Sequence, residues 1–138
     1  SRGLGDVYKR QELNIKINVT AIFTIQQIDR LIENIIPKEE IILSIFAGRI
    51  ADTGRDPTEI FLNIKKKLDN KSKKFKTLWA SVREVYNIYQ AAKVGSNIIT
   101  VTPESLAKLN LMNKDLNQYS IETVKMFYED ARKGNLKI

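Results

Sequence analysis

The chain of 138 residues contains no cysteine and no histidine. Without cysteine there is no disulfide framework and no thiolate metal site, and without histidine the commonest metal ligand and general base are missing. Catalysis by a Ser-His-Asp or Cys-His arrangement within these residues is therefore excluded. We expect neither a metal nor another cofactor.

Long apolar runs are also missing. None approaches the roughly 20 residues that a helix needs to cross a bilayer. The N-terminus lacks the basic-then-apolar order of a signal peptide. We therefore expect a cytoplasmic protein that has no membrane partner.

Positive charge, in contrast, is in excess, because 23 Lys and Arg face 16 Asp and Glu and the net charge is +7. Such an excess favours binding to nucleic acid, to an anionic surface or to a phosphorylated small molecule. Net charge alone does not show which of these is the partner. The length allows one domain with a modest core. It falls short of the roughly 250 residues typical of a closed eight-stranded α/β barrel.

The first eleven residues, SRGLGDVYKRQ, show no helical or strand period and contain two glycines. They resemble translated library-adapter sequence, and a disordered native tail is the alternative. We expect a non-native or disordered leader over 1–11 and begin the predicted fold at residue 12.

Four short apolar runs, rich in β-branched residues, recur along the rest of the chain. Runs that are apolar on both faces are typical of parallel strands buried on both sides. The predicted strands cover 17–23, 40–47, 76–81 and 97–102.

An amphipathic stretch follows each of these runs. Isoleucines three or four apart predict a helix before Pro37, Asp56-Pro57 marks the start of a second, and Gly95 suits the end of a third. A short helix over 104–109 and a longer one over 121–134 complete the pattern. The alternation predicts a parallel α/β sheet, either doubly wound or part of a barrel.

Polar residues gather near the ends of the first two predicted strands, where parallel α/β sheets place their chemistry. Asn18 and Thr20 share one face of the first strand, and Ser44 and Phe46 share one face of the second. A buried amide without a hydrogen bond costs about 1–3 kcal/mol, so a satisfied core asparagine is the alternative to a ligand-binding one.

Two arginines follow neighbouring strands. Gly48 and Arg49 come after the second strand, and Ser81 and Arg83 come after the third, at the start of a helix. An arginine offers a planar fork of donors, and a helix N-terminus favours anions. The sequence therefore predicts an anion site, with surface salt bridges as the alternative.

The segments INVTAIFTIQQ, SIFAGRIADTGRDP and LWASVREVYNIYQAAKVGSNIITVTPESLAKL resemble the second half of the transaldolase family, which includes the fructose-6-phosphate aldolases. The resemblance covers residues 13–130. It implies a partial TIM (β/α)8 barrel of the class I aldolase type, with the four units as strands five to eight. Residues 12–138 would then form the C-terminal half of the barrel.

The resemblance also implies a mechanism. In the family a lysine on strand four forms a Schiff base with a ketose phosphate, and retro-aldol cleavage leaves a dihydroxyacetone enamine that an aldose phosphate accepts. Asn18 would bind substrate hydroxyls or the imine, and Thr20 would orient the water that shuttles protons.

The remaining motif positions imply substrate and phosphate contacts. Ser44 would lie beside the substrate hydroxyls, Arg49 would hold the sugar phosphate, and Ser81 and Arg83 would form a phosphate clamp. Phe46 stands where the family's aldolases typically have tyrosine, which favours transfer over simple cleavage.

The first four strands and the Schiff-base lysine have no counterpart in these residues. We therefore expect a truncated reading of a longer gene, inactive by itself, from an enzyme of carbohydrate metabolism, the pentose phosphate pathway. Its expected partners are sugar phosphates and, in the full-length form, further copies of itself.

Two other functions stay open at this point. Residues 65–76 hold seven lysines, enough for a nucleic-acid patch, although a solvated helix end explains them better and aromatic interleaving is scarce. We therefore expect no nucleic-acid partner. A noncatalytic sugar-phosphate-binding paralogue is the other alternative.

Overall fold

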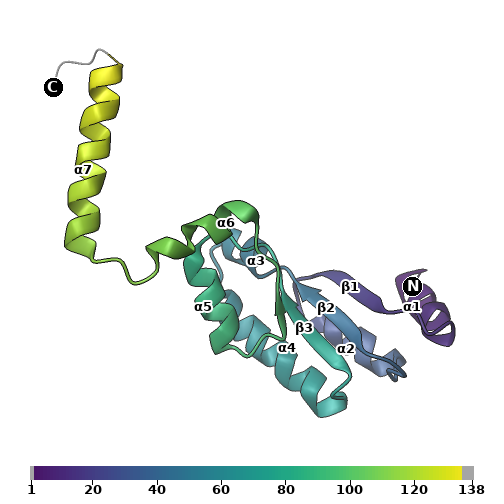
Figure 1. Ribbon diagram of the computed structural model, residues 1–138. Helices are drawn as coiled ribbons and strands as arrows, with labels where there is room; N and C mark the ends of the chain where they lie inside the picture. Colours follow the sequence, from purple (N-terminus) through teal and green to yellow (C-terminus); the bar gives the residue numbers. More distant parts are fainter. Residues whose placement is uncertain (1, 135–138) are drawn as a thin grey trace. The chain divides into compact units, whose positions relative to one another are not determined.

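The computed structural model describes residues 2–134. The chain divides into two compact units, Ser1–Leu106 and Ala107–Ile138, which are described separately. Strands and helices alternate in the first unit (Figure 1). Its elements are α1 (Arg2–Glu12), β1 (Ile17–Ile22), α2 (Ile25–Asn34), β2 (Ile41–Ile45), α3 (Ala47–Asp52), α4 (Pro57–Lys71), β3 (Phe75–Trp79), α5 (Val85–Lys93), β4 (Ile98–Ile99) and α6 (Pro103–Ala107), of which the last ends one residue into the second unit.

The strands form one parallel sheet in the order β1-β2-β3-β4. In its register Ile41 of β2 lies between Ile17 of β1 and Phe75 of β3. A doubly wound sheet reverses its strand order, whereas a barrel adds each strand beside the previous one. The sequential order confirms the α/β prediction and is that of part of a (β/α)8 barrel.

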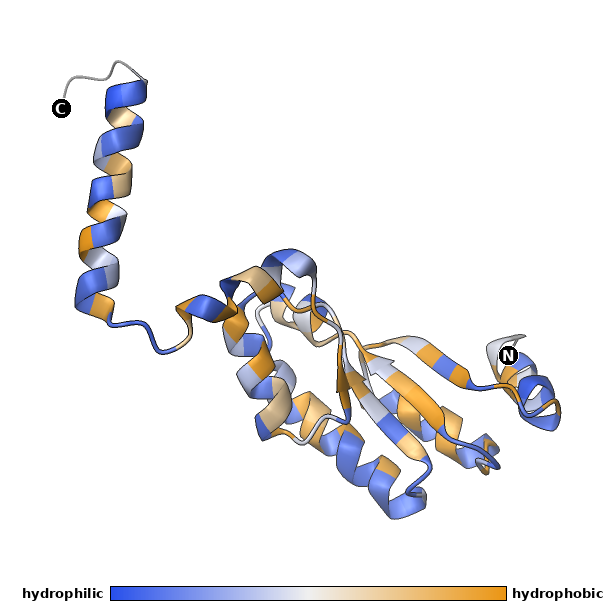
Figure 2. Cartoon of the chain, viewed as in Figure 1, coloured by the Kyte–Doolittle hydropathy of each residue, from blue (hydrophilic) through white to orange (hydrophobic). Residues whose placement is uncertain are grey.

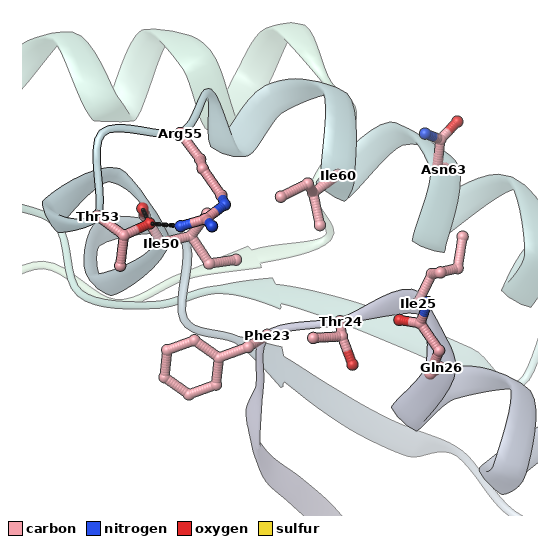
Figure 3. A pocket seen from close by; sticks show the side chains of 9 residues that line it. All are labelled: Phe23, Thr24, Ile25, Gln26, Ile50, Thr53, Arg55, Ile60 and Asn63. Carbon is pink, nitrogen blue, oxygen red and sulfur yellow. Dashed lines mark hydrogen bonds between the residues drawn. The ribbon is translucent and has the colours of Figure 1, made fainter.

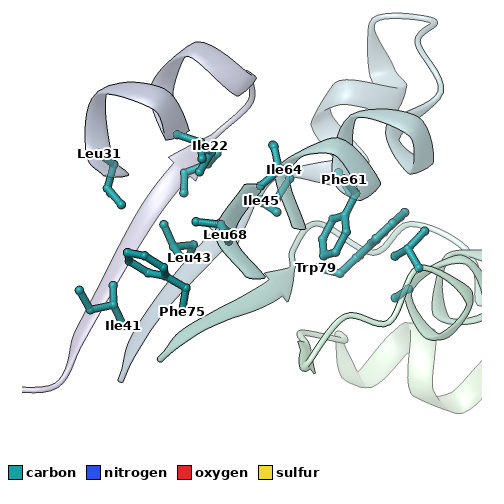
Figure 4. Packing of buried hydrophobic residues seen from close by; sticks show 14 of the residues in the cluster. Ile22, Leu31, Ile41, Leu43, Ile45, Phe61, Ile64, Leu68, Phe75 and Trp79 are labelled. Atoms are coloured by element: carbon teal, nitrogen blue, oxygen red, sulfur yellow. The ribbon is translucent and has the colours of Figure 1, made fainter. Parts of the chain in front are cut away.

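One face of the sheet carries the hydrophobic core. Alternate residues of β2, Ile41, Leu43 and Ile45, are fully buried together with side chains of α2 and α4 (Figure 4). The ring of Trp79 on β3 lies 5.3 Å from that of Phe61 on α4. Hydrophobic residues accordingly dominate β2 and alternate with hydrophilic ones along α4 (Figure 2). Since strand side chains alternate, the polar residues of β1 and β2 lie on the opposite face.

Side-chain caps set where α2 and α4 begin. Thr24 and Gln27 form a capping box at the start of α2. At α4 the Asp56 carboxylate accepts hydrogen bonds from the hydroxyl and the backbone N–H of Thr58, at 2.5 and 2.9 Å. These two bonds lower the pKa of Asp56 below its usual 3.8, because they favour the charged form.

Regular structure in α1 corrects the prediction of an irregular leader. Leu4 and Val7 pack against the core and Gln11 is buried, so the buried side of α1 recurs every three or four residues. That period was the signal, and the glycines at positions 3 and 5 hid it. The non-native origin of 1–11 stays a prediction. Ser1 and residues 135–138 of the predicted ranges lie outside the described residues.

All four strands differ from their predicted ranges, since β1 ends one residue earlier and β3 covers Phe75–Trp79, and the differences matter most at β2 and β4. β4 covers only Ile98–Ile99, and just before it the Asn97 side-chain oxygen accepts hydrogen bonds from the backbone N–H and the hydroxyl of Thr77. β2 ends at Ile45, and the Gly48-Arg49 pair, expected after a strand that reached residue 47, lies inside α3.

The second unit contains η1 (Lys108–Leu111), a 3-10 helix, and α7 (Leu116–Lys133). The helix predicted over 121–134 begins earlier, because Asp115 caps it by accepting from the Gln118 backbone N–H at 2.8 Å. None of the α7 residues is buried. Its exposed large apolar side chains are Leu116, Tyr119, Ile121, Val124, Met126, Phe127 and Tyr128.

Gly48 fastens α3 to the segment after β3. A Cβ atom at this position would lie 1.6 Å from the carbonyl oxygen of Ser81, so only glycine fits without a backbone shift. The Gly48 N–H also donates to the Ala80 carbonyl at 3.2 Å. Ser81 itself has a φ of 66°. The two segments that carry Arg49 and Arg83 are therefore packed backbone to backbone.

We predict that Gly48→Ala lowers the free energy of unfolding by about 2 kcal/mol or more, since the methyl group must displace backbone. Urea unfolding followed by far-UV circular dichroism measures this. Gly5→Ala is the matched control, because no atom lies within 4 Å of its added Cβ and alanine favours the helix. Equal unfolding midpoints for Gly48→Ala and the unchanged chain would contradict the packing argument.

Candidate functional site

Ser44 and Asn18 connect the polar face of β2 to that of β1. The Ser44 hydroxyl donates to Asn18 Oδ1 at 2.7 Å. Ser44 is only 4% exposed, whereas Asn18 is exposed. With its oxygen held by Ser44, the Asn18 amide keeps its N–H donors for a ligand. Ser44 thus positions Asn18, and its own contact with a substrate hydroxyl stays a prediction.

Thr20 lies next to an irregularity in β1. The β1–β2 register shifts between Val19 and Ile22, and Ala21 has a φ of 58°. Backbone of this kind costs about 1–3 kcal/mol in a non-glycine residue and recurs where a strand re-aims a side chain beside a site. The Gln27 side chain supports it by donating to the Ala21 carbonyl at 3.2 Å. Thr20 itself is exposed.

Aromatic rings support Arg49. Its guanidinium lies 5.9 Å from the centroid of the Phe46 ring, which in turn lies 5.7 Å from the ring of Phe23. Arg49 is exposed and forms no ion pair with any residue from 2 to 134. The aromatic contact orients the cation without neutralising it. Arg49 is therefore available to an anion.

Arg83, in contrast to Arg49, forms an ion pair. Its guanidinium pairs with Asp52 at 3.0 Å, and both side chains are about half exposed. Asp52 lies three residues after Arg49 on α3, so both arginine side chains reach the same short helix. The salt-bridge alternative thus holds for Arg83 in this structure. An exposed pair of this kind contributes only about 0–1 kcal/mol.

Two backbone donors just before α5 already have partners within the chain. The backbone N–H groups of Arg83 and Glu84 both donate to the Asn87 side-chain oxygen, at 2.8 and 2.9 Å. These donors are used within the chain and do not face a ligand. The sequence signal that could have shown this is the amide three residues after Glu84, which is the spacing of a capping box.

Local partners occupy the lysines of 65–76. Lys65 pairs with Asp69 at 3.1 Å, and Lys67 contacts Asp29. Lys76 and Lys74 reach residues before β2, the Glu40 carboxylate at 3.6 Å and the Lys38 carbonyl respectively. Four of the seven lysines, on α4, on β3 and in the loop between them, thus have partners within the chain, which does not favour a nucleic-acid patch.

Sequence reasoning missed a pocket of about 420 Å³ between the start of α2, the loop after α3, and α4 (Figure 3). Arg55 is its one charged lining residue. Within residues 2–134 no group of acidic side chains is arranged to hold a metal ion. No helix in the same range combines the length and apolar character needed to cross a membrane.

The fold and the site together define a class of protein. A parallel sheet whose strands lie in sequential order, with helices on its apolar face, is typical of α/β barrels. The family model described as Transaldolase/Fructose-6-phosphate aldolase matches residues 7–137. The chain belongs to this family.

Individual relatives agree with the family match. A probable transaldolase of Mesorhizobium japonicum is 35% identical over 100 residues, covering 72% of this chain and 44% of the relative. A probable transaldolase 2 of Listeria monocytogenes is 33% identical over 109 residues, 78% of this chain and 47% of the relative. A probable transaldolase of Thermoanaerobacter sp. strain X514 is 33% identical over the whole chain and 60% of the relative. The chain thus spans about half the length of these curated relatives.

We predict that Asn18 and Ser44 are energetically coupled. Combining Asn18→Ala and Ser44→Ala should cost about 0.5–1.5 kcal/mol less than the sum of the two single changes, because the double variant loses their hydrogen bond only once. Urea unfolding of the four proteins gives the coupling. As a control, Asn18→Ala with Thr53→Ala should be additive, since the Thr53 hydroxyl bonds to Ile50 and Arg55 and to neither residue of the pair. A coupling of zero between Asn18 and Ser44 would show that their contact contributes nothing.

Proposed function

We propose that this chain supplies the sugar-phosphate-binding half of a transaldolase-type enzyme, which transfers or cleaves a dihydroxyacetone unit through a Schiff base. The observation that carries the proposal is Arg49, an unneutralised cation held on Phe46 at the carboxyl end of β2. Asn18 and Thr20 are exposed on the neighbouring strand. Membership of the family supports the sugar phosphate as the ligand.

In this proposal Arg49 binds the phosphate and Arg83 joins it on ligand binding. Arg83 would leave Asp52 to do so, and giving up an exposed pair costs about 0–1 kcal/mol, against about 1.5–3 kcal/mol for a hydrogen bond to a charged group. Ser81, half-buried beside Gly48, would add a hydroxyl. The exchange favours phosphate over the internal carboxylate.

Asn18 and Thr20 would act on the reacting part of the sugar. The Asn18 amide donates to a substrate hydroxyl or to the imine intermediate, with its orientation set by Ser44. Thr20 holds a water that carries protons to and from the intermediate. Phe46 brings no hydroxyl to this site, which supports transfer over cleavage.

The Schiff-base lysine belongs, in this proposal, to strand four of the family's barrel and is supplied from outside these residues. The chain by itself then binds sugar phosphate without reacting with it. A cytoplasmic location and a place in pentose phosphate metabolism accompany the proposal as predictions.

Binding of fructose 6-phosphate tests the proposal. We predict saturable binding by calorimetry, weakened roughly tenfold or more by either Arg49→Gln or Arg83→Gln, because each removes a charge-assisted hydrogen bond. Arg30→Gln is the control, since it removes the same charge from an exposed position on α2. Neutral fructose should bind more weakly than its phosphate.

Two results would contradict this assignment. Unchanged affinity in both arginine variants would show that Arg49 and Arg83 do not bind the phosphate. A covalent adduct after borohydride reduction, detected by mass spectrometry, would show that a lysine of this chain forms the Schiff base.

We further propose that the protein self-associates. β1 pairs only with β2 and β4 only with β3 in the described sheet, and the apolar side chains of α7 are exposed. Unpaired strand edges and exposed apolar helix faces favour association.

Sedimentation velocity should therefore give a mass above the 15.8 kDa of one chain. Replacing Val124 and Phe127 on α7 by glutamate should lower that mass, because both exposed apolar side chains become charged. Asn117→Glu on the same helix, a change from one polar residue to another, should leave it unchanged. A compact monomer that unfolds cooperatively would contradict the proposal.

A further inference from the structure

The pocket beside Arg55 is formed entirely by segments that follow β1 and β2. Its walls come from the start of α2, the loop between α3 and α4, and the first turns of α4 (Figure 3). β1 and β2 pair with each other, and α2 and α4 share one hydrophobic core. Residues of two neighbouring βα units therefore line this pocket, whereas the sugar-phosphate site proposed above needs a lysine from elsewhere.

The position of Arg55 in the pocket is set by neutral groups. Its Nη1 donates to the Thr53 hydroxyl at 2.8 Å, and that hydroxyl donates to the Ile50 carbonyl at 2.7 Å. Arg55 forms no ion pair with any described residue, and the neighbouring Asp56 carboxylate is occupied by Thr58. The guanidinium is thus oriented while its charge and its remaining N–H donors stay available.

Apolar side chains make up the rest of the wall around this cation. Ile50 is buried, and Phe23, Ile25 and Ile60 are only partly covered. A volume of about 420 Å³ falls in the range of roughly 300–1,000 Å³ found for small-molecule pockets. An inorganic ion by itself would leave these apolar side chains exposed to water, whereas an apolar group joined to the anion would remove them from water, which is favourable.

The amide side chains of Gln26 and Asn63 also line the pocket, so polar groups approach from more than one side (Figure 3). No carboxylate lines it. Charge and hydrogen-bonding capacity therefore favour an anion that also accepts hydrogen bonds, such as a carboxylate or a phosphate.

We propose that this pocket is a second binding site, specific for a small anion joined to an apolar group of about the size of a phenyl ring. Arg55 binds the carboxylate or phosphate, and the isoleucine and phenylalanine walls bind the apolar part. The site is distinct from the Arg49 site, although Phe23 borders both, because its ring contacts that of Phe46.

Methyl NMR of the 138-residue chain, labelled at isoleucine, tests the proposal. Phenylacetate and phenyl phosphate are the two anionic probes, and neutral phenylacetamide is the matched control. At least one anion should shift the methyl signals of Ile25, Ile50 and Ile60 saturably, with roughly tenfold or higher affinity than the amide has. The better of the two anions distinguishes a carboxylate ligand from a phosphate ligand.

Substitutions of Arg55 show whether this residue binds the anion. Arg55→Gln should weaken binding of the better anion roughly tenfold or more, and Arg55→Lys should weaken it less, because the charge is kept and the planar fork is lost. Arg30→Gln removes one charge elsewhere on the surface and should leave the affinity unchanged.

Several results would overturn the proposal. Equal affinity for the amide and the anions, or full affinity in Arg55→Gln, would show that Arg55 selects no anion. Methyl shifts that follow protein concentration instead of probe concentration would assign the pocket to a second copy of the chain. Isoleucine methyl signals without dispersion would show that the chain forms no such pocket.

Discussion

The contact between Gly48 and Ser81 is the constraint on which the rest of the site depends. Because the Ser81 carbonyl occupies the space of a Cβ atom at position 48, α3 lies directly against the segment that follows β3. That approach puts Asp52 within reach of Arg83 and presents Arg49 from the same helix, at the carboxyl end of β2. A side chain at position 48 would separate α3 from the segment that carries Arg83, and so would move apart the two arginines of the proposed phosphate site.

The two faces of the sheet carry different kinds of side chain. On β2 the odd-numbered residues Ile41, Leu43 and Ile45 are buried among the helices, and Ser44 points to the opposite face, where it meets Asn18. Because side chains alternate along each strand, the same short segments present an apolar face that packs against the helices and a polar face that carries Ser44 and Asn18. A register shift of one residue would exchange these two surfaces.

Patterns that repeat were predictable from the sequence, and partners distant in the chain were not. The apolar runs predicted each strand to within a few residues, apart from β4, and capping residues such as Asp56 predicted where α4 starts. The position of Arg49 just beyond the carboxyl end of β2 also followed from the pattern, whereas Asn18 is the second residue of β1 and lies near the amino end of that strand. The ion pair between Arg83 and Asp52 joins residues 31 positions apart and depends on a backbone contact that no local pattern encodes. The α1 helix was missed for a different reason, since two glycines outweighed a period carried by only three residues.

Arg49 and Arg55, which form no ion pair with any described residue, illustrate how differently the parts of this chain depend on the whole barrel. Arg55 is held by Thr53 and Ile50, all within six residues, so its pocket requires only α2, α3 and α4 to be packed. Arg49 is held just as locally, by Phe46 three residues earlier. Its proposed chemistry nevertheless requires a nucleophile on a strand beyond β1, whose outer edge has no partner in the described sheet. The proposed binding groups are thus set by contacts within one or two βα units, whereas the proposed reaction needs a lysine from outside these residues, and part of a barrel can keep the first without the second.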